Sequence, residues 1–96
     1  MATAQRLTDI SQGLRSVPDW KINSQGKLEK EFTFKKFTEA FSFMTRVAFE
    51  AEQLNHHPDW FNSYNRVRIE LFTHDAQCIT DTDLELARRI DAIDWT

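Results

Sequence analysis

The sequence has few of the residues that cross-link or interrupt a chain. Its 96 residues include one cysteine, two glycines and two prolines. The single cysteine, Cys78, excludes an internal disulfide framework and is typical of a protein from a reducing compartment. Because no stretch has the composition of a flexible linker, we expect one domain that covers residues 1–96.

Long apolar runs and an excess of basic residues are also missing. No run approaches the roughly 20 residues that a membrane span needs, and the first residues, MATAQRLTD, lack the apolar core of a secretory signal. The net charge of -3 argues against a nucleic-acid-binding protein, because phosphate recognition needs a positive surface. We therefore expect a cytoplasmic protein that binds neither a membrane nor, directly, a nucleic acid.

The longest regular pattern is helical and covers residues 35–55. Apolar residues recur there every three or four positions, which predicts an amphipathic helix. The predicted buried stripe consists of Phe37, Ala40, Phe41, Met44, Val47, Ala48, Ala51 and Leu54. Phe43 falls at the edge of this stripe and Phe49 nearly opposite it. An aromatic side chain that faces away from the core indicates a second contact surface, such as another subunit, although a single exposed phenylalanine is also common.

The segments before this helix predict a short helix and a hairpin. Thr8 is a candidate N-cap, apolar residues keep helical spacing as far as Val17, and Pro18 ends the helix. The turn residues 23–26 then separate two extended runs. In the second run Leu28, Phe32 and Phe34 share one face by period-two counting, which Lys30 interrupts.

The segments after the long helix predict two strands and a final helix. Val67, Ile69 and Leu71 alternate with polar residues, and residues 61–64 form a shorter strand. Thr80 and Asp83 fit a capping box at the start of the last helix. The order is helix-strand-strand-helix-strand-strand-helix, which predicts an α+β fold with a four-stranded antiparallel sheet and helices packed on one face.

All three histidines of the chain lie near the end of the long helix or past the following strands: His56, His57 and His74. Pro58 restricts His57 to extended geometry, so the helix must end near Asn55 or His56. The carbonyl groups at a helix C-terminus favour a charged imidazolium, and such a histidine is suited to donate a proton near neutral pH. Glu52 precedes His56 by one helical turn, so a pair between them is expected if the helix continues as far as His56.

Residue types alone leave three interpretations of the histidines open. Three imidazoles and Cys78 are a set of zinc ligands, although adjacent histidines are awkward as paired ligands. A histidine at a helix end also caps terminal carbonyl groups without further function, and His57 has Trp60 within reach to pack against. The third interpretation is metal-free proton transfer on a small polar substrate.

The segments FSFMTRVAFEAEQLNHHPDWFNSYNRVRIELFTHD and ITDTDLELARRID resemble the pterin-4a-carbinolamine dehydratase family, which includes the dimerisation cofactor of a homeodomain transcription factor. The resemblance covers nearly the whole chain. It is carried by Glu52, three residues, then His56-His57-Pro58, followed by Trp60, Tyr64, Thr73-His74 and Asp83. The order and spacing of these residues make the pattern specific.

This resemblance implies an activity and a role for each histidine. The implied reaction is dehydration of a 4a-hydroxytetrahydropterin to the quinonoid dihydropterin, with no metal or organic cofactor. His56 and His74 would transfer protons, and His57 would mainly position the substrate.

The family pattern also implies further substrate contacts. This sequence departs from the pattern at three positions. Asn55, Trp60, Phe72, Thr73 and Asp83 would contact or flank the pterin, although the cap of the last helix accounts for Asp83 equally well. Asn55 stands where some members have aspartate, and Phe72 stands where a small hydroxyl residue is frequent. Cys78 replaces a usual glycine and would be strained if its position requires a positive φ.

Known members of the family associate as dimers that extend the sheet and as tetramers through the long helix. Phe43 and Phe49 are therefore candidates for a contact between subunits. Animal members also bind a transcription factor, so a coactivator role, with the nucleus as a further location, is the alternative to an enzyme.

Overall fold

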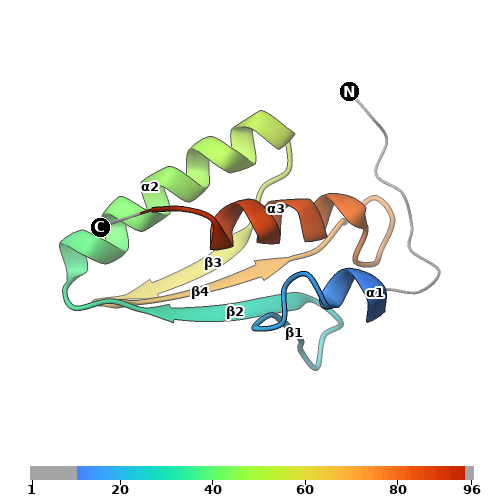
Figure 1. Ribbon diagram of the computed structural model, residues 1–96, viewed down its shortest axis with the longest axis horizontal. Helices are drawn as coiled ribbons and strands as arrows, with labels where there is room; N and C mark the ends of the chain where they lie inside the picture. The colour runs from blue at the N-terminus through green and yellow to red at the C-terminus, as the bar shows by residue number, and fades with distance from the viewer. Residues whose placement is uncertain (1–10, 95–96) are drawn as a thin grey trace.

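The computed structural model describes residues 11–94. The elements in chain order are α1 (Ser11–Leu14), β1 (Lys21–Ile22), β2 (Leu28–Thr33), α2 (Phe37–Leu54), β3 (Asp59–Ser63), β4 (Arg66–Leu71) and α3 (Asp81–Asp91). This order confirms the predicted α+β arrangement (Figure 1). The candidate cap at Thr8 lies outside the described residues. None of the helices within residues 11–94 is both long and apolar enough to span a bilayer.

The first helix is shorter than predicted. It ends at Leu14 rather than at Val17, because the backbone N–H groups of Ser16 and Val17 donate to the carbonyls of Gly13 and Leu14 in tight turns. Val17 is nevertheless fully buried, as its spacing predicted.

The four strands form one antiparallel sheet in the order β1-β2-β4-β3. The register of the two central strands places Leu28 opposite Leu71, and Phe32 opposite Val67. Directly opposed residues share a face of the sheet, so these side chains form the face that the helices cover (Figure 1).

Lys30 occupies this apolar face, opposite Ile69. Its ammonium nitrogen lies 2.8 Å from the Asp91 carboxylate at the end of α3 and 4.7 Å from the centroid of the Phe32 ring. The side chain therefore runs along the edge of the core and pairs its charge at the rim. This contact explains the interruption of the hydrophobic pattern in β2.

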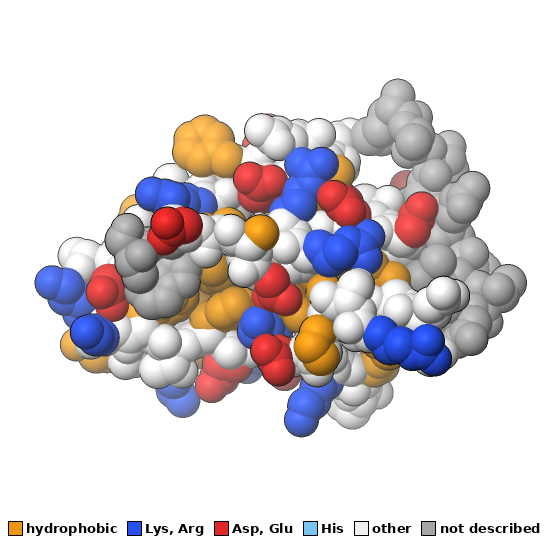
Figure 2. All heavy atoms as spheres, viewed as in Figure 1, with side chains coloured by type: hydrophobic (Ala, Val, Ile, Leu, Met, Phe, Trp, Pro, Cys, Tyr) orange, Lys and Arg blue, Asp and Glu red, His pale blue; other side chains and the backbone are white. Residues whose placement is uncertain are grey.

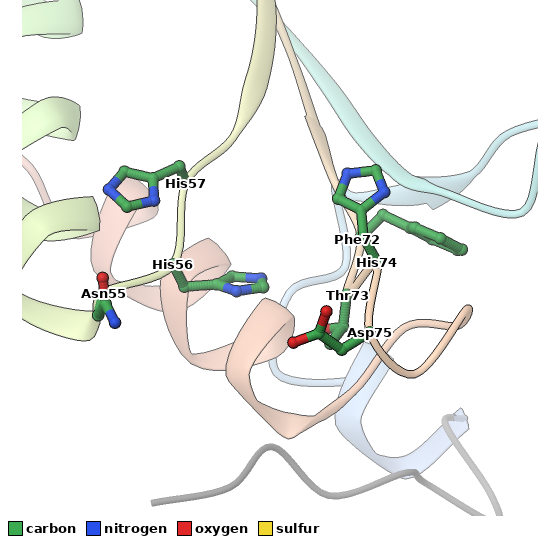
Figure 3. A pocket seen from close by; sticks show the side chains of 7 residues that line it. All are labelled: Asn55, His56, His57, Phe72, Thr73, His74 and Asp75. Carbon is green, nitrogen blue, oxygen red and sulfur yellow. The ribbon is translucent and has the colours of Figure 1, made fainter. Parts of the chain in front are cut away.

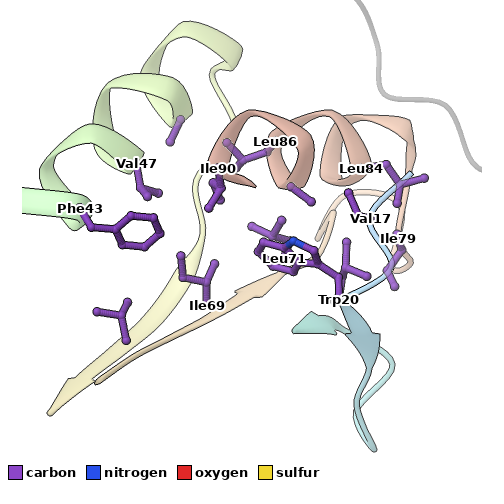
Figure 4. Close-up of a cluster of buried hydrophobic side chains, with 14 of the residues drawn as sticks. Val17, Trp20, Phe43, Val47, Ile69, Leu71, Ile79, Leu84, Leu86 and Ile90 are labelled. Carbon is purple, nitrogen blue, oxygen red and sulfur yellow. The ribbon is translucent and has the colours of Figure 1, made fainter. Parts of the chain in front are cut away.

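The core fills the space between the sheet and the two long helices (Figure 4). Its fully buried large side chains come from α2, α3, the central strands and the turn after α1, and include Phe43, Leu28, Ile69, Leu71, Leu86, Ile90 and Val17. Ile79 and Leu84, on either side of the capping box that starts α3, are buried as well. Burial of this kind contributes about 25 cal/mol for each Å² of apolar surface.

The buried side of α2 differs from the prediction. Phe43 is 1% exposed and packs on Phe32 and Phe34, with ring centroids 4.7 and 5.1 Å apart. Its assignment to a contact between subunits is therefore wrong. Phe37 and Phe41, predicted to be buried, are 46% and 58% exposed. The helix is turned so that its Phe43 side meets Phe32 of β2 and Phe34 just after that strand. Periodicity along α2 alone does not reveal this rotation.

The outer side of α3 is charged and mixed in sign (Figure 2). Glu85 pairs with Arg88 at 3.1 Å and with Arg89 at 3.0 Å, and Arg89 also reaches Glu50 of α2 at 3.5 Å. Hydrogen bonds from Arg89 and then Arg88 lower the pKa of Glu85 from its ordinary value.

Candidate active site

One wall of the candidate site is the turn at the end of α2. Asn55 has a φ of 50° and thus a left-handed conformation. The N–H groups of Asn55 and His56 donate to the carbonyls of Glu52 and Ala51 at 3.1 and 3.0 Å. This is the Schellman pattern, which satisfies terminal carbonyls and reverses the chain direction. The helix thus ends at Leu54, with Asn55 as its cap, which agrees with the predicted end near Asn55 or His56.

The other wall is the loop between β4 and α3. Thr73 and Cys78 close this loop, since each backbone N–H donates to the carbonyl of the other, at 3.1 and 3.4 Å. The carbonyl of His74 accepts the backbone N–H of Gln77 at 3.2 Å. Gln77 has the positive φ of the loop, 57°, so the strain predicted at Cys78 is absent.

A pocket of about 260 Å³ lies between these two walls. Its lining consists of Asn55, His56, His57, Phe72, Thr73, His74 and Asp75. Residues from the end of α2 face residues from the end of β4 across it (Figure 3). The fold therefore brings all three histidines to one pocket, although His57 and His74 are far apart in the sequence.

His56 is held by a buried carboxylate. Its Nε2 atom lies 2.5 Å from Oδ1 of Asp83, whose side chain has no exposed surface, while the His56 side chain is 15% exposed. The predicted pair between Glu52 and His56 is wrong. The left-handed turn at Asn55 directs His56 toward α3, and Glu52 instead contacts Nε2 of His57 at 2.6 Å.

Asp83 joins His56 to the start of α3. Its Oδ2 atom accepts the hydroxyl of Thr73 at 2.8 Å and the backbone N–H of Thr80 at 2.9 Å. The second of these bonds belongs to the predicted capping box, which is confirmed. Asp83 is not part of the pocket lining, so in this structure it reaches the pocket through His56.

His74 is held more loosely. Its side chain is 65% exposed, and its Nε2 atom lies 3.8 Å from the carboxylate of Asp59, which is also exposed. The ring meets that of Phe72 edge to face, with centroids 5.4 Å apart. This imidazole is accessible both to the pocket and to solvent (Figure 3).

The remaining candidate residues differ in whether they line the pocket. Asn55 and Phe72 line the pocket. Thr73 lines it too, but its hydroxyl and its backbone N–H are engaged in the bonds described above. Trp60 lies on β3, outside the pocket lining, and its contact with a substrate stays a prediction. Asp75, the carboxylate that directly follows His74, also lines the pocket, although it was not among the predicted substrate contacts.

The zinc interpretation lacks an assembled ligand set. Within residues 11–94 no group of three or more His, Cys, Asp or Glu side chains is arranged to hold a metal ion. The plain capping interpretation does not describe His56 either, since its ring nitrogen is bonded to Asp83 rather than to a helix carbonyl. Imidazoles on facing walls can instead donate and accept protons at two positions of one ligand.

Comparison with known proteins assigns the chain to a family. The model of the family described as pterin 4 alpha carbinolamine dehydratase matches residues 4–93. A protein of Synechococcus sp. (strain WH7803) with the provisional name pterin-4-alpha-carbinolamine dehydratase is 53% identical over 78 residues, which cover 81% of this chain and 83% of that protein. A protein of Solibacter usitatus with the same provisional name is 46% identical and matches 97% of each chain.

Two solved structures resemble the fold. The crystal structure of a transcriptional coactivator/pterin dehydratase from Brucella melitensis superposes with a TM-score of 0.84, at 36% identity, over 94% of this chain and 97% of that one. A pterin dehydratase-like RuBisCO assembly factor of the alpha-carboxysome superposes with a TM-score of 0.65 over 77% of this chain and 87% of that one, and at 22% identity shares the fold alone. The chain therefore belongs to the pterin-4a-carbinolamine dehydratase family.

Proposed function

We propose that the protein dehydrates a 4a-hydroxytetrahydropterin, such as 4a-hydroxytetrahydrobiopterin, to the quinonoid dihydropterin. An acid donates a proton to the 4a oxygen, the C–O bond breaks, and water leaves. A base removes the proton of the neighbouring ring nitrogen, and the electron pair of that N–H bond forms the new C=N bond. The elimination is redox-neutral, so we propose that it needs no metal or organic cofactor.

The observation that carries this proposal is the placement of three histidines around one pocket. Hydroxide is a poor leaving group, so a donor must protonate the oxygen while a second group accepts the nitrogen proton. His56 and His74 lie on facing walls and are proposed to transfer these two protons. His57 is proposed to position the pterin, together with Asn55 and Phe72.

The test is a stopped-flow assay with a 4a-hydroxytetrahydropterin. Wild-type protein should accelerate dehydration above the buffer rate, and His74→Ala should lower kcat by roughly 10²-fold or more, the size expected for loss of a proton-transfer group. Glu31→Gln, on the sheet face opposite the helices, is the matched control and should keep the wild-type rate. A wild-type rate equal to that of buffer would refute the activity, and full activity in His74→Ala would refute the role of His74.

The biological setting is proposed from the same reaction. A dehydratase of this kind regenerates pterin cofactor for aromatic amino acid hydroxylases, which would place it in the cytoplasm. Detection of the hydroxylated pterin in cells that lack the protein, but not in cells that carry it, would support this setting.

A second candidate function is binding of a protein partner, and the exposed aromatic residues of α2 favour it. Phe49 is 68% exposed, and the rings of Phe37 and Phe41 lie 6.0 Å apart on the outer side of the helix. We propose that this side of α2 and the free edges of the sheet hold a homodimer or homotetramer, with a transcription factor as the alternative partner. Phe49→Asp should then lower the sedimentation coefficient of the assembly, and an unchanged value would refute the contact.

A further inference from the structure

Three polar side chains are buried together beneath the pocket, where α3 meets the loop after β4. Thr80 and Asp83 have no exposed surface and Thr73 is 8% exposed. The hydroxyl oxygens of Thr73 and Thr80 lie 2.7 Å apart, and the Thr73 hydroxyl donates to Oδ2 of Asp83 at 2.8 Å. The order of contacts is therefore Thr80, Thr73, Asp83 and then His56.

The hydrogen bonds among these side chains are consistent with one arrangement of the hydroxyl hydrogens. A threonine hydroxyl has a single hydrogen, and Thr73 uses it on Asp83. The hydrogen between the two threonine oxygens must then come from Thr80. Since the backbone N–H of Thr80 also donates to Oδ2 of Asp83, Thr80 supports the carboxylate twice, directly through its backbone and indirectly through its hydroxyl.

This arrangement determines which nitrogen of His56 carries the hydrogen. An ionised carboxylate only accepts hydrogen bonds, so the hydrogen between Oδ1 of Asp83 and Nε2 of His56 belongs to the imidazole. In a neutral imidazole the second nitrogen is then an acceptor. Nδ1 of His56 is therefore the atom left to exchange protons with a ligand in the pocket that His56 lines.

We propose that Thr80, acting through Thr73 and Asp83, is a positioning residue that holds His56 as the Nε2–H tautomer and makes Nδ1 its proton-exchanging atom. Thr80 touches no ligand in this arrangement, since it is fully buried and lies outside the pocket lining. The tautomer follows from the hydrogen bonds that an ionised Asp83 accepts. Only its use in catalysis rests on the proposed function.

The tautomer is measured by long-range proton–nitrogen NMR of protein labelled with ¹⁵N-histidine, at a pH where the imidazole is neutral. His56 should appear as Nε2–H in the wild type and in Thr80→Ser, which keeps the hydroxyl. In Thr80→Val, which has the same shape without the hydroxyl, a share of the Nδ1–H form should appear. A wild-type His56 in the Nδ1–H form, or a Thr80→Val spectrum identical to the wild type, would overturn the proposal.

Kinetics separate this role from a purely structural one. Thr80→Val should lower kcat on the order of tenfold, as loss of an orienting partner does, with KM little changed, and Thr80→Ser should restore the rate. If Thr80→Val does not fold, Thr73→Val, which removes the hydroxyl that donates directly to Asp83, takes its place. An inactive wild type whose His56 is Nε2–H would contradict the proposed function and still support the positioning role of Thr80. A Thr80→Val variant with the wild-type kcat would overturn that positioning role.

Discussion

His56 and His57 are neighbours in the sequence, and each bonds a carboxylate through Nε2 at nearly the same length, 2.5 and 2.6 Å. Their surroundings differ. The His56 side chain is 15% exposed and its partner Asp83 is fully buried, whereas His57 is 57% exposed and its partner Glu52 is 74% exposed. Figure 3 shows the two rings directed to opposite sides of the backbone.

The comparison teaches that the environment, rather than the bond length, decides what each contact does. An ion pair in solvent is screened, and the entropy lost when its flexible side chains are ordered offsets most of its attraction. A contact with a buried, fully hydrogen-bonded carboxylate fixes one ring orientation and one tautomer. The same residue type is thus suited to the proton transfer proposed for His56 and to the adaptable substrate contact proposed for His57.

The largest difference should appear in catalysis. His56→Ala should lower kcat by roughly 10²–10⁴-fold, the contribution of a positioned proton-transfer group. His57→Ala should chiefly raise KM, because its loss removes binding energy that is common to the substrate and the transition state. Steady-state kinetics of both variants test the contrast, and a larger loss of kcat in His57→Ala would reverse the assigned roles.

The next largest difference should appear in the free energy of unfolding when the carboxylate of Asp83 or that of Glu52 is removed. Asp83→Ala removes the partner of three donors and should lower the free energy of unfolding by about 3–5 kcal/mol, as loss of one member of a buried pair does. Glu52→Ala should lower it by about 0–1 kcal/mol, the range of exposed pairs. Urea denaturation of both variants measures the difference. Equal losses would show that burial does not distinguish the two sites.

The turn at Asn55, which separates the two rings, should contribute less to the free energy of unfolding. Asn55 has a left-handed conformation, which asparagine and glycine adopt more readily than other residues. Asn55→Ala should therefore cost roughly 1 kcal/mol, whereas Asn55→Gly should be nearly neutral. Thermal denaturation compares the two variants. If alanine is tolerated as well as glycine, the backbone conformation is not what keeps asparagine at this position.

The smallest effect should come from Glu85, which extends the comparison to a carboxylate on the surface of α3. Arg89 and Arg88 lower its pKa, so its folded pKa is below its unfolded one. Its contribution is present above the unfolded pKa, about 4.3, and is lost as pH falls through the lower folded value. Glu85→Gln should remove that small acid-dependent part of the wild-type stability profile. A profile in Glu85→Gln that matches the wild type would contradict the contribution.

Local sequence patterns predicted where a helix begins or ends when the signal comes from neighbouring residues. The end of α2 follows from Pro58, and the start of α3 follows from Thr80 and Asp83, because each signal acts within one helical turn. The family pattern predicted that the histidines share a pocket, a contact that spacing alone left open.

Contacts between distant elements could not be predicted in the same way. The partner of His56 lies 27 positions away in the sequence, and its choice depends on how the turn at Asn55 directs the ring. The rotation of α2 depends on Phe32 and Phe34, against which Phe43 packs. Periodicity places residues around one helix, but it does not say which side another element will cover.

The carboxylate of Asp83 both caps the first turn of α3 and orients His56. The beginning of a helix and the histidine proposed to transfer a proton thus depend on one side chain. Any motion that frays the first turn of α3 also releases the imidazole, so heat should abolish activity before the core melts. Evolution cannot adjust the start of this helix and the chemistry of this histidine independently, since a substitution at Asp83 changes both at once.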